Sequence, residues 1–234
     1  RRQRQMCIRD SICGFETPDA GGIFLNGKPL AEENIRRRAQ HIGYVMQNPN
    51  QMISKTMIYD EVALGLQRSG LTEEQIREKV EATLKVCGLY PFRNWPISAL
   101  SFGQKKRVTI ASVLVLDPEL ILLDEPTAGQ DFRHYTDIME FLRGLNARGV
   151  TVVMITHDMH LAIEYTDRAV VMADGEKIGD GDVFRMLSDP DILRRASLKE
   201  TSLCKLARRL GIEPEAFVRH FIEYERMGRR HDEQ

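Results

Sequence analysis

The sequence predicts an α/β fold, because short apolar runs alternate with helical segments along the chain. Residues 120–123 and 150–155 are continuous apolar runs of the length and composition of strands buried on both faces of a sheet. Residues 102–116 precede the first run, and residues 135–148 lie between the two runs. Both segments have apolar positions at helical spacing. Strands that alternate with helices are typical of a sheet covered by helices on its faces.

Two carboxylates follow the first apolar run directly. Asp124 and Glu125 come after Leu123 and precede Pro126. Open α/β sheets bind their ligands at the C-terminal ends of strands, so this pair is a candidate site. An isolated Asp-Glu pair more often caps a helix or pairs with surface cations, but four apolar residues before the pair and Pro-Thr after it favour the functional interpretation.

A predicted helix over residues 102–116 begins just after Ser101, which is a good N-cap residue. Asp117-Pro118 ends it. The N-terminus of a helix presents free backbone N–H groups and the positive end of the helix dipole, both of which suit a phosphate. The turn at Ser101 is therefore a second candidate site.

Together, residues 100–107 (LSFGQKKR) and 121–127 (ILLDEPT) resemble the signature and Walker B motifs of ATP-binding cassette (ABC) ATPases. The form LSFGQKKR is most similar to the ATPase subunits of energy-coupling-factor importers, which take up vitamins and metal ions. The resemblance covers residues 12–187. It implies an ABC-type P-loop NTPase domain with an α-helical signature subdomain, and ATP and Mg²⁺ as its ligands.

The resemblance assigns roles to residues at the predicted strand ends. Asp124 would hold Mg²⁺, and Glu125 would act as general base toward the attacking water. Gln47, which follows the apolar run 42–46, resembles the Q-loop glutamine that reaches the metal or the water. His157, after the run 150–155, resembles the switch histidine that contacts the γ-phosphate; a histidine or glutamine without this context would be read as structural.

Other residues would act across an interface between two cassettes. Ser101, Gly103 and Gln104 would bind the γ-phosphate of a nucleotide held by the opposite subunit, which requires a head-to-tail dimer with a second ABC ATPase subunit or cassette. Asp131, in the D-loop, would lie at the same interface. Phe102 replaces the usual second glycine of the motif, so its side chain must point away from phosphate.

The first eleven residues, RRQRQMCIRDS, do not fit the family. A Walker A loop, GxxxxGK[ST], would place its Gly-Lys-Ser/Thr near residues 4–7, yet no glycine precedes Gly14. We interpret the chain as N-terminally truncated, or its first eleven residues as foreign to the native gene; a degenerate nucleotide site is the alternative. Either way, the chain alone is expected to bind ATP poorly.

The predicted organisation has three parts: residues 1–11, an ABC ATPase domain over residues 12–190 with its helical subdomain at about 50–115, and a C-terminal helical appendage over residues 191–234. The length of 234 residues suffices for one domain with a sizeable core and a small addition. The sequence leaves open whether the appendage packs on its own domain or on a dimer mate.

Composition excludes several functions. The net charge of -1 argues against nucleic-acid binding, and the basic stretch at residues 36–40 is expected to be a solvated face. Four scattered cysteines indicate reduced thiols in a cytosolic protein. No apolar run approaches the roughly 20 residues that cross a bilayer. We therefore expect a peripheral protein on the cytoplasmic face of the membrane, attached through a partner.

That partner is expected to be a transmembrane coupling subunit that docks near Met52 to Val62. Met52, Ile53, Met57 and Ile58 are apolar where a surface helix is often polar, although core packing explains each about as well. Two alternatives remain: a non-transport ABC ATPase, and a non-catalytic partner that lends its signature motif to another subunit's site. The transported substrate and the choice between homodimer, heterodimer and fused cassettes are not readable.

Overall fold

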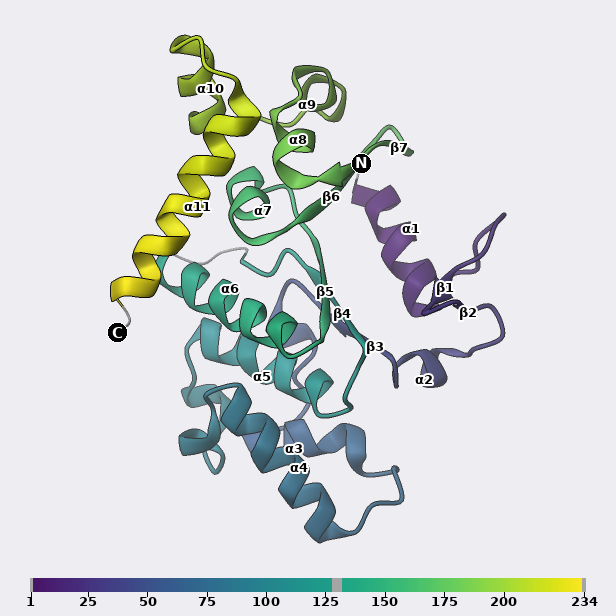
Figure 1. Cartoon of the computed structure of the whole chain (residues 1–234). Coiled ribbons are helices and arrows are strands. Elements are labelled where there is room, and N and C mark those ends of the chain that lie inside the picture. Colours follow the sequence, from purple (N-terminus) through teal and green to yellow (C-terminus); the bar gives the residue numbers. More distant parts are fainter. Residues whose placement is uncertain (1, 128–131, 233–234) are drawn as a thin grey trace. The chain divides into compact units, whose positions relative to one another are not determined.

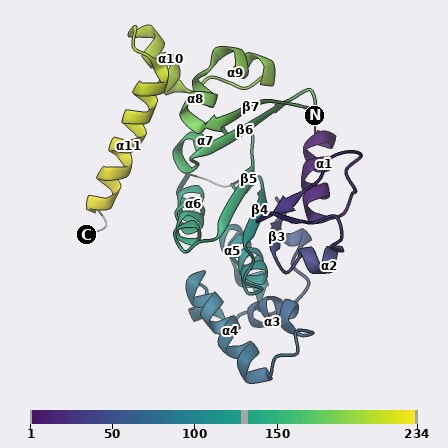
Figure 2. The same ribbon diagram turned by 45° about the vertical axis from the view of Figure 1, so that its right-hand side comes forward.

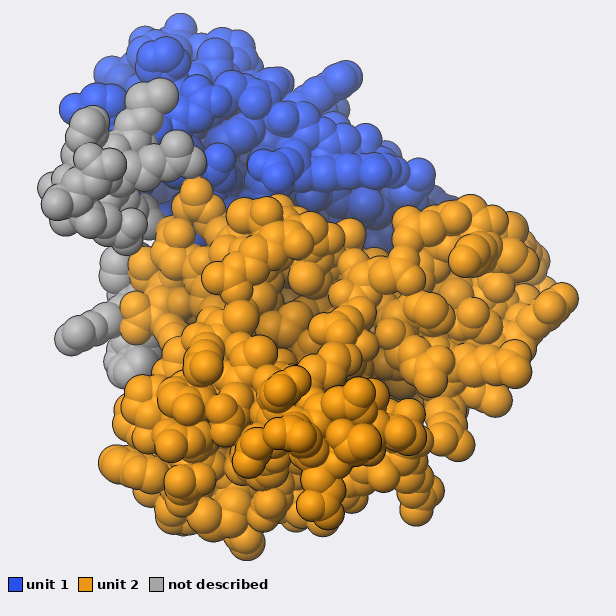
Figure 3. Space-filling model, turned by 60° about the horizontal axis from the view of Figure 1, so that its bottom comes forward, with its two compact units in different colours: residues 1, 156–234 blue, residues 2–155 orange. Residues whose placement is uncertain are grey.

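The computed structural model describes residues 2–127 and 132–232, and the side chains of residues 7–127 and 135–226. These residues form two compact units, one of residues 2–155 and one of residues 156–234, which Figure 3 colours separately. Each unit is described by itself below.

The first unit is built on a parallel three-stranded sheet in the order β3-β4-β5 (Figure 1). The strands are β3 (Ile42–Val45), β4 (Leu120–Asp124) and β5 (Thr151–Ile155). Ile121, Leu122 and Leu123 of the central strand are all at most 1% exposed, so β4 is covered on both faces. The α/β prediction and the two strands are confirmed, but β5 is not buried on both faces, because Thr151 and Val153 are exposed.

The first unit also contains helices and 3₁₀ turns. They are α1 (Arg2–Cys13), α2 (Ile35–Arg38), α3 (Ile58–Ala63), α4 (Glu73–Val86), α5 (Phe102–Leu114), α6 (Phe132–Ala147) and the 3₁₀ turns η1 (Pro49–Gln51), η2 (Leu64–Leu66), η3 (Tyr90–Phe92) and η4 (Ile97–Ala99). A hairpin of β1 (Phe24–Leu25) and β2 (Lys28–Pro29) turns at Asn26-Gly27, as the sequence predicts; both turn residues have positive φ, which this type of turn requires. Figures 1 and 2 place α6 on one side of the sheet and α1 on the other.

Helix α5 packs closely on the sheet. An added Cβ at Gly43 in β3 would lie 2.0 Å from the Val113 side chain of α5, so only glycine fits there. On its other side α5 shares a buried cluster with α3 and α4, in which Ile58, Val62 and Leu84 are fully buried. The sheet and this cluster therefore fix the helix that carries the signature motif.

One helix was not predicted, and two expectations from the sequence need correction here. Residues 2–13 form helix α1, although their sequence has no clear amphipathic period. Arg38 is 6% exposed rather than solvated, because its guanidinium donates to the carbonyl oxygens of Leu30, Glu33, Ser11 and Ile12. Ile58 and Val62, expected near a docking surface, are core residues.

The second unit combines a hairpin with helices. Its elements are α7 (Met159–Tyr165), β6 (Arg168–Ala173), β7 (Glu176–Asp182), α8 (Val183–Ser188), α9 (Pro190–Ala196), α10 (Ser202–Arg209) and α11 (Pro214–Asp232). The hairpin turns at Asp174-Gly175 as predicted. One buried cluster joins residues from Met159 to Ile222, so the predicted appendage of residues 191–234 shares its core with the segment before it.

Within the described parts of the chain, no helix is long and apolar enough to cross a membrane.

Candidate functional site

The C-terminal edge of the sheet brings three predicted residues to one place. Val45 of β3 pairs with Leu123 of β4, and Asp124 pairs with Ile155 of β5. Gln47 follows β3 by two residues, and Asp124 and Glu125 end and follow β4. Parallel strands share one C-terminal edge, where ligands of α/β proteins bind.

The backbone of Glu125 is in the left-handed region, with φ of 44°. Its N–H donates to the carbonyl oxygen of Ile155 over 2.9 Å, which ties the residue to the neighbouring strand. A left-handed conformation costs a non-glycine residue about 1–2 kcal/mol. Such strain is concentrated at functional sites, where the surrounding structure enforces it. The geometry thus turns the chain sharply just where the candidate base lies.

Asp124 contacts a cation in this structure. Its Oδ2 accepts from Arg9 over 3.0 Å, and the same guanidinium also bonds the Tyr44 hydroxyl at 3.0 Å. Hydrogen bonding to Asp10 is the main reason that the pKa of Arg9 is raised. Burial is the main reason that the pKa of Tyr44 is raised.

The residues at this edge fit Mg²⁺ by ligand type. The Asp124 carboxylate and the Gln47 amide oxygen are oxygen donors, which Mg²⁺ prefers. Among the described residues no group of three or more His, Cys, Asp and Glu side chains is placed to hold a metal ion. Mg²⁺ usually takes one or two carboxylates and completes its shell with water and phosphate. Arg9 occupies one of the two oxygens of the Asp124 carboxylate.

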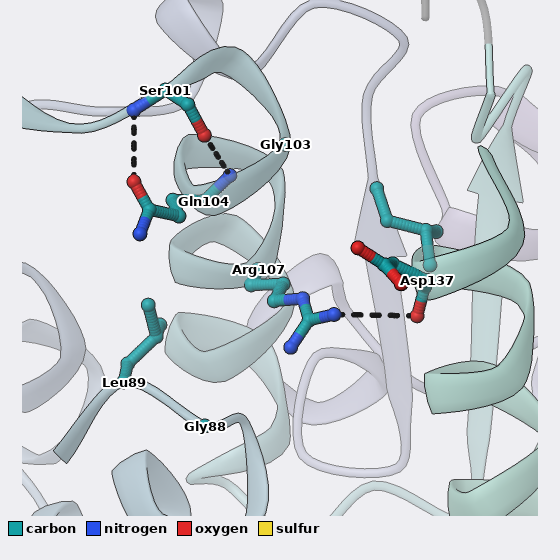
Figure 4. Close-up of a pocket in the computed structure, with 8 residues that line it drawn as sticks. Gly88, Leu89, Ser101, Gly103, Gln104, Arg107 and Asp137 are labelled. Atoms are coloured by element: carbon teal, nitrogen blue, oxygen red, sulfur yellow. Dashed lines mark hydrogen bonds between the residues drawn. The ribbon is translucent and has the colours of Figure 1, made fainter. Parts of the chain in front are cut away.

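Helix α5 begins with a capping box at the signature motif. The Ser101 Oγ accepts from the Gln104 backbone N–H at 3.3 Å, and the Gln104 Oε1 accepts from the Ser101 N–H at 3.0 Å (Figure 4). The box thus uses an acceptor oxygen of each side chain. The donors, namely the Ser101 O–H and the Gln104 NH₂, remain outside it, together with the N–H of Gly103 in the first turn. An exposed helix start that offers donors is suited to an anion.

A cavity of about 420 Å³ lies beside this helix start and is lined by Gly88, Leu89, Ser101, Gly103, Gln104, Arg107, Asp137 and Ile138 (Figure 4). Arg107 crosses it, donating to the Asp137 carbonyl oxygen of α6 at 3.3 Å. The same guanidinium lies 5.6 Å from the centre of the Phe141 ring. Arg107 therefore joins the signature helix to α6.

Lys106 is a residue whose role the sequence analysis missed. Its side chain is fully buried, and its Nζ donates to the carbonyl oxygens of Met46, at 2.6 Å, and Gln47, at 3.0 Å. Burial lowers its pKa to about 8, against the charge of Asp124, which raises it. No signal in the run Lys105-Lys106-Arg107 distinguishes the middle lysine, since such runs usually lie on solvated faces.

The segment after Gln47 lies beside a second cavity. This cavity, of about 320 Å³, is lined by Asn50, Ile53, Lys55, Thr56, Pro96, Ile97, Ser98 and Lys105. Met52, Ile53 and Met57 are partly exposed, whereas Ile58 is buried. Glu61, 4% exposed, accepts from the backbone N–H groups of Ser54 and Lys55 at 2.8 and 2.7 Å.

Two further residues were predicted for the site, His157 and Asp131. His157 follows β5 by two residues along the chain but belongs to the second unit, in which its side chain is exposed. Asp158, next to it, caps α7 by accepting from the N–H groups of His160 and Leu161. Asp131 lies outside the described residues.

A parallel sheet that ends in an acid pair, and a helix start that offers donors, are typical of a nucleotide-binding α/β ATPase domain. The family model described as ABC transporter matches residues 8–128, more than half of the chain, and the chain belongs to this family. The match begins within the first eleven residues, which we expected to be foreign to the family. ATP binding and ATP hydrolysis are properties of this family.

Similar proteins agree with this membership. ABC transporter ATP-binding proteins of Clostridium perfringens and Enterococcus faecalis are 58% and 59% identical over 95% and 92% of this chain. The chain spans about two fifths of their length, namely 39% and 38%. Among solved structures, cbiO1 from Clostridium perfringens, part of the ABC transporter complex cbiONQ, matches with a TM-score of 0.76 at 31% identity, covering 89% of this chain and 83% of that one. This match supports the resemblance to energy-coupling-factor ATPases.

Proposed function

We propose that the chain belongs to the ATP-hydrolysing subunit of an energy-coupling-factor importer, which powers uptake of a vitamin or a metal ion. The observation that carries the proposal is the acid pair at the end of β4, with Glu125 held in a strained backbone conformation beside β5. The match to a part of the cbiONQ complex supports the importer type.

In this proposal the residues at the sheet edge divide the chemistry. The Glu125 carboxylate accepts a proton from the attacking water, and a general base of this kind accelerates a reaction by about 10²–10⁴-fold. Asp124 and Gln47 hold Mg²⁺ once Arg9 has left. When bound, that ion neutralises phosphate charge. His157 orients the water and the γ-phosphate.

The signature residues act on a second nucleotide. Ser101, Gly103 and Gln104 donate to the γ-phosphate held by another cassette, which requires a head-to-tail dimer. The support is the capping box, which leaves the donors of both side chains available. Asp131 is proposed to lie at the same interface.

The partner is proposed to be a transmembrane coupling subunit, which would hold the protein at the cytoplasmic face of the membrane. Ile53 lines the cavity of about 320 Å³, and Met52 is its neighbour in the chain. Both side chains are partly exposed and would give the coupling subunit an apolar contact. Ile58 and Val62 are core residues and are not part of this proposed docking surface. The net charge of -1 argues against nucleic acid as the partner.

We also propose that this chain alone binds ATP poorly, because it has no GxxxxGK[ST] loop to cradle the phosphates. Arg9 on the Asp124 carboxylate supports the same proposal. Without a nucleotide of its own, the chain acts as a partner whose signature helix completes the site of an intact cassette.

The test is Glu125→Gln in the complete protein assembled with its membrane partner. We expect kcat for ATP hydrolysis to fall by about 10²–10⁴-fold while ATP affinity stays within about threefold, since only the base is removed. Glu78→Gln, on an exposed face of α4, is the matched control and should leave both values unchanged. Hydrolysis at the normal rate by Glu125→Gln would contradict the proposal.

A further inference from the structure

The three consecutive basic residues of the signature helix contact three different elements. Successive residues on an α-helix differ by about 100° in direction, so three in a row spread over more than half a turn. Lys105 lines the cavity beside Ile53, Lys106 bonds the backbone after β3, and Arg107 bonds α6. Lys106 is the fully buried one of the three.

A buried ammonium group is stable only where hydrogen bonds compensate for the loss of water. Lys106 obtains them from the carbonyl oxygens of Met46 and Gln47. These atoms lie in the loop that carries the proposed Q-loop glutamine. The loop and α5 are therefore coupled in position, because moving one without the other would leave the buried charge of Lys106 without its acceptors.

A second buried charge holds the other end of the same loop. The Glu61 carboxylate of α3 accepts from the N–H groups of Ser54 and Lys55 and from the Ser54 hydroxyl. A cation thus binds the carbonyl oxygens at the start of the segment, and an anion binds the amide groups at its end. Residues 48–53, which include the partly exposed Met52 and Ile53, lie between these two fixed points.

We infer that Lys106 is a positioning residue that couples the signature helix to Gln47 and to the docking segment of residues 48–53. A shift of the Ser101 end of α5 on nucleotide contact would carry Lys106, five residues further along the same rigid helix, and with it the two carbonyl groups. The inference rests on the proposed function, because it assigns the coupling to the same site.

The first test is hydrogen exchange on the chain itself, which needs no nucleotide. The amides of Gln51, Met52 and Ile53 donate to Asn48 and Pro49 within the loop, so their exchange reports the order of the segment. Lys106→Met keeps the length of the side chain and removes its charge and donors. We expect exchange of these amides to rise at least tenfold in Lys106→Met, and by no more than twofold in Lys106→Arg, which keeps the donors.

Two controls separate positioning from a general loss of stability. Lys79→Met removes a lysine on α4 whose Nζ pairs with Asp117 at the surface, and should leave exchange of the loop unchanged. Amides of α4 should exchange alike in all variants. Loop exchange in Lys106→Met within twofold of the wild type would overturn the inference. Should Lys106→Met not fold, Lys106→Leu, which also removes the charge and the donors, takes its place with the same criterion.

The second test measures coupling in the complete protein with its membrane partner. We expect Lys106→Met to lower kcat at least tenfold with the KM for ATP within threefold, and Lys106→Arg to restore kcat to within threefold of the wild type. Equal losses in Lys106→Met and Lys106→Arg, or an unchanged kcat, would overturn the inference. A wild-type protein without ATPase activity would instead contradict the proposed function, and the exchange result on Lys106 would still stand.

Discussion

The backbone of Glu125 shows how a single residue can combine strain and chemistry. Its φ of 44° lies in the region that favours glycine, yet the proposed general base needs a carboxylate there. The hydrogen bond from its N–H to Ile155 and the buried strand before it enforce the conformation. At this residue, therefore, the fold gives up stability to aim a side chain at the sheet edge.

This strain predicts an inverted order of stability between two truncations at Glu125. Both Glu125→Ala and Glu125→Gly remove the carboxylate, but only glycine adopts positive φ without cost. The free energy of unfolding of Glu125→Gly should therefore be about 1 kcal/mol higher than that of Glu125→Ala. At Glu78, exposed in the interior of α4, the alanine variant should instead be the more stable by about 1 kcal/mol. Urea denaturation measures both pairs. The same order at both positions would refute the strain.

At the scale of elements, two helices of the first unit begin with the same device. Thr72 with Gln75 opens α4, and Ser101 with Gln104 opens α5, each with both reciprocal hydrogen bonds. One box only begins a helix, whereas the other also carries the proposed phosphate donors. This pair offers a comparison in which structure is matched and function is not.

We predict that Thr72→Ala and Ser101→Ala each lower the free energy of unfolding by about 1 kcal/mol, because each removes one N-cap acceptor. Only Ser101→Ala should also slow ATP hydrolysis in the complete dimer, at saturating ATP. Chemical denaturation and a steady-state ATPase assay make the two measurements. A loss of activity in both variants would mean that Ser101 acts through helix stability alone.

The sequence predicted these elements well where a local pattern determines them. The apolar run of β4 and the N-cap at Ser101 are both local, and both are confirmed. The burial of Lys106 could not be predicted, because its acceptors lie about 60 residues away along the chain.

The burial of α3 was also not predicted, because its apolar residues fitted a docking surface and core packing about equally. Ile58 and Val62 were expected near a docking surface, but the cluster that buries them includes distant residues of α4 and α5. For the candidate site, the strand ends that bring Gln47 and Asp124 together follow from the alternation of elements. The contact of Asp124 with Arg9 depends on α1, which has no readable period.

At the scale of the whole molecule, the described residues contain two buried clusters, one in each unit. Leu84 and Cys87 belong to the cluster of the first unit, and Leu187 and Cys204 to that of the second. Each cysteine is free and buried, so its modification reports the opening of its own unit.

Burial raises the pKa of the Cys87 thiol from its ordinary value of 9.0 to about 12. Between these values the unfolded chain releases a proton that the folded chain retains. The free energy of unfolding therefore falls as the pH rises in this range. Below about pH 9 the ionisation of Cys87 does not reduce the free energy of unfolding. At pH 8 the folded thiol is almost entirely protonated, so its reaction with a thiol reagent requires the unit to open.

We therefore predict that the two cysteines respond to different core mutations. Leu187→Ala should cost about 2–5 kcal/mol and accelerate modification of Cys204 at pH 8 at least tenfold, while the rate at Cys87 stays within threefold. Leu84→Ala should have the opposite effect. Mass spectrometry of the labelled peptides assigns each rate. If either mutation accelerated both cysteines equally, the two units would open as one cooperative structure, and the division at residue 155 would have no energetic meaning.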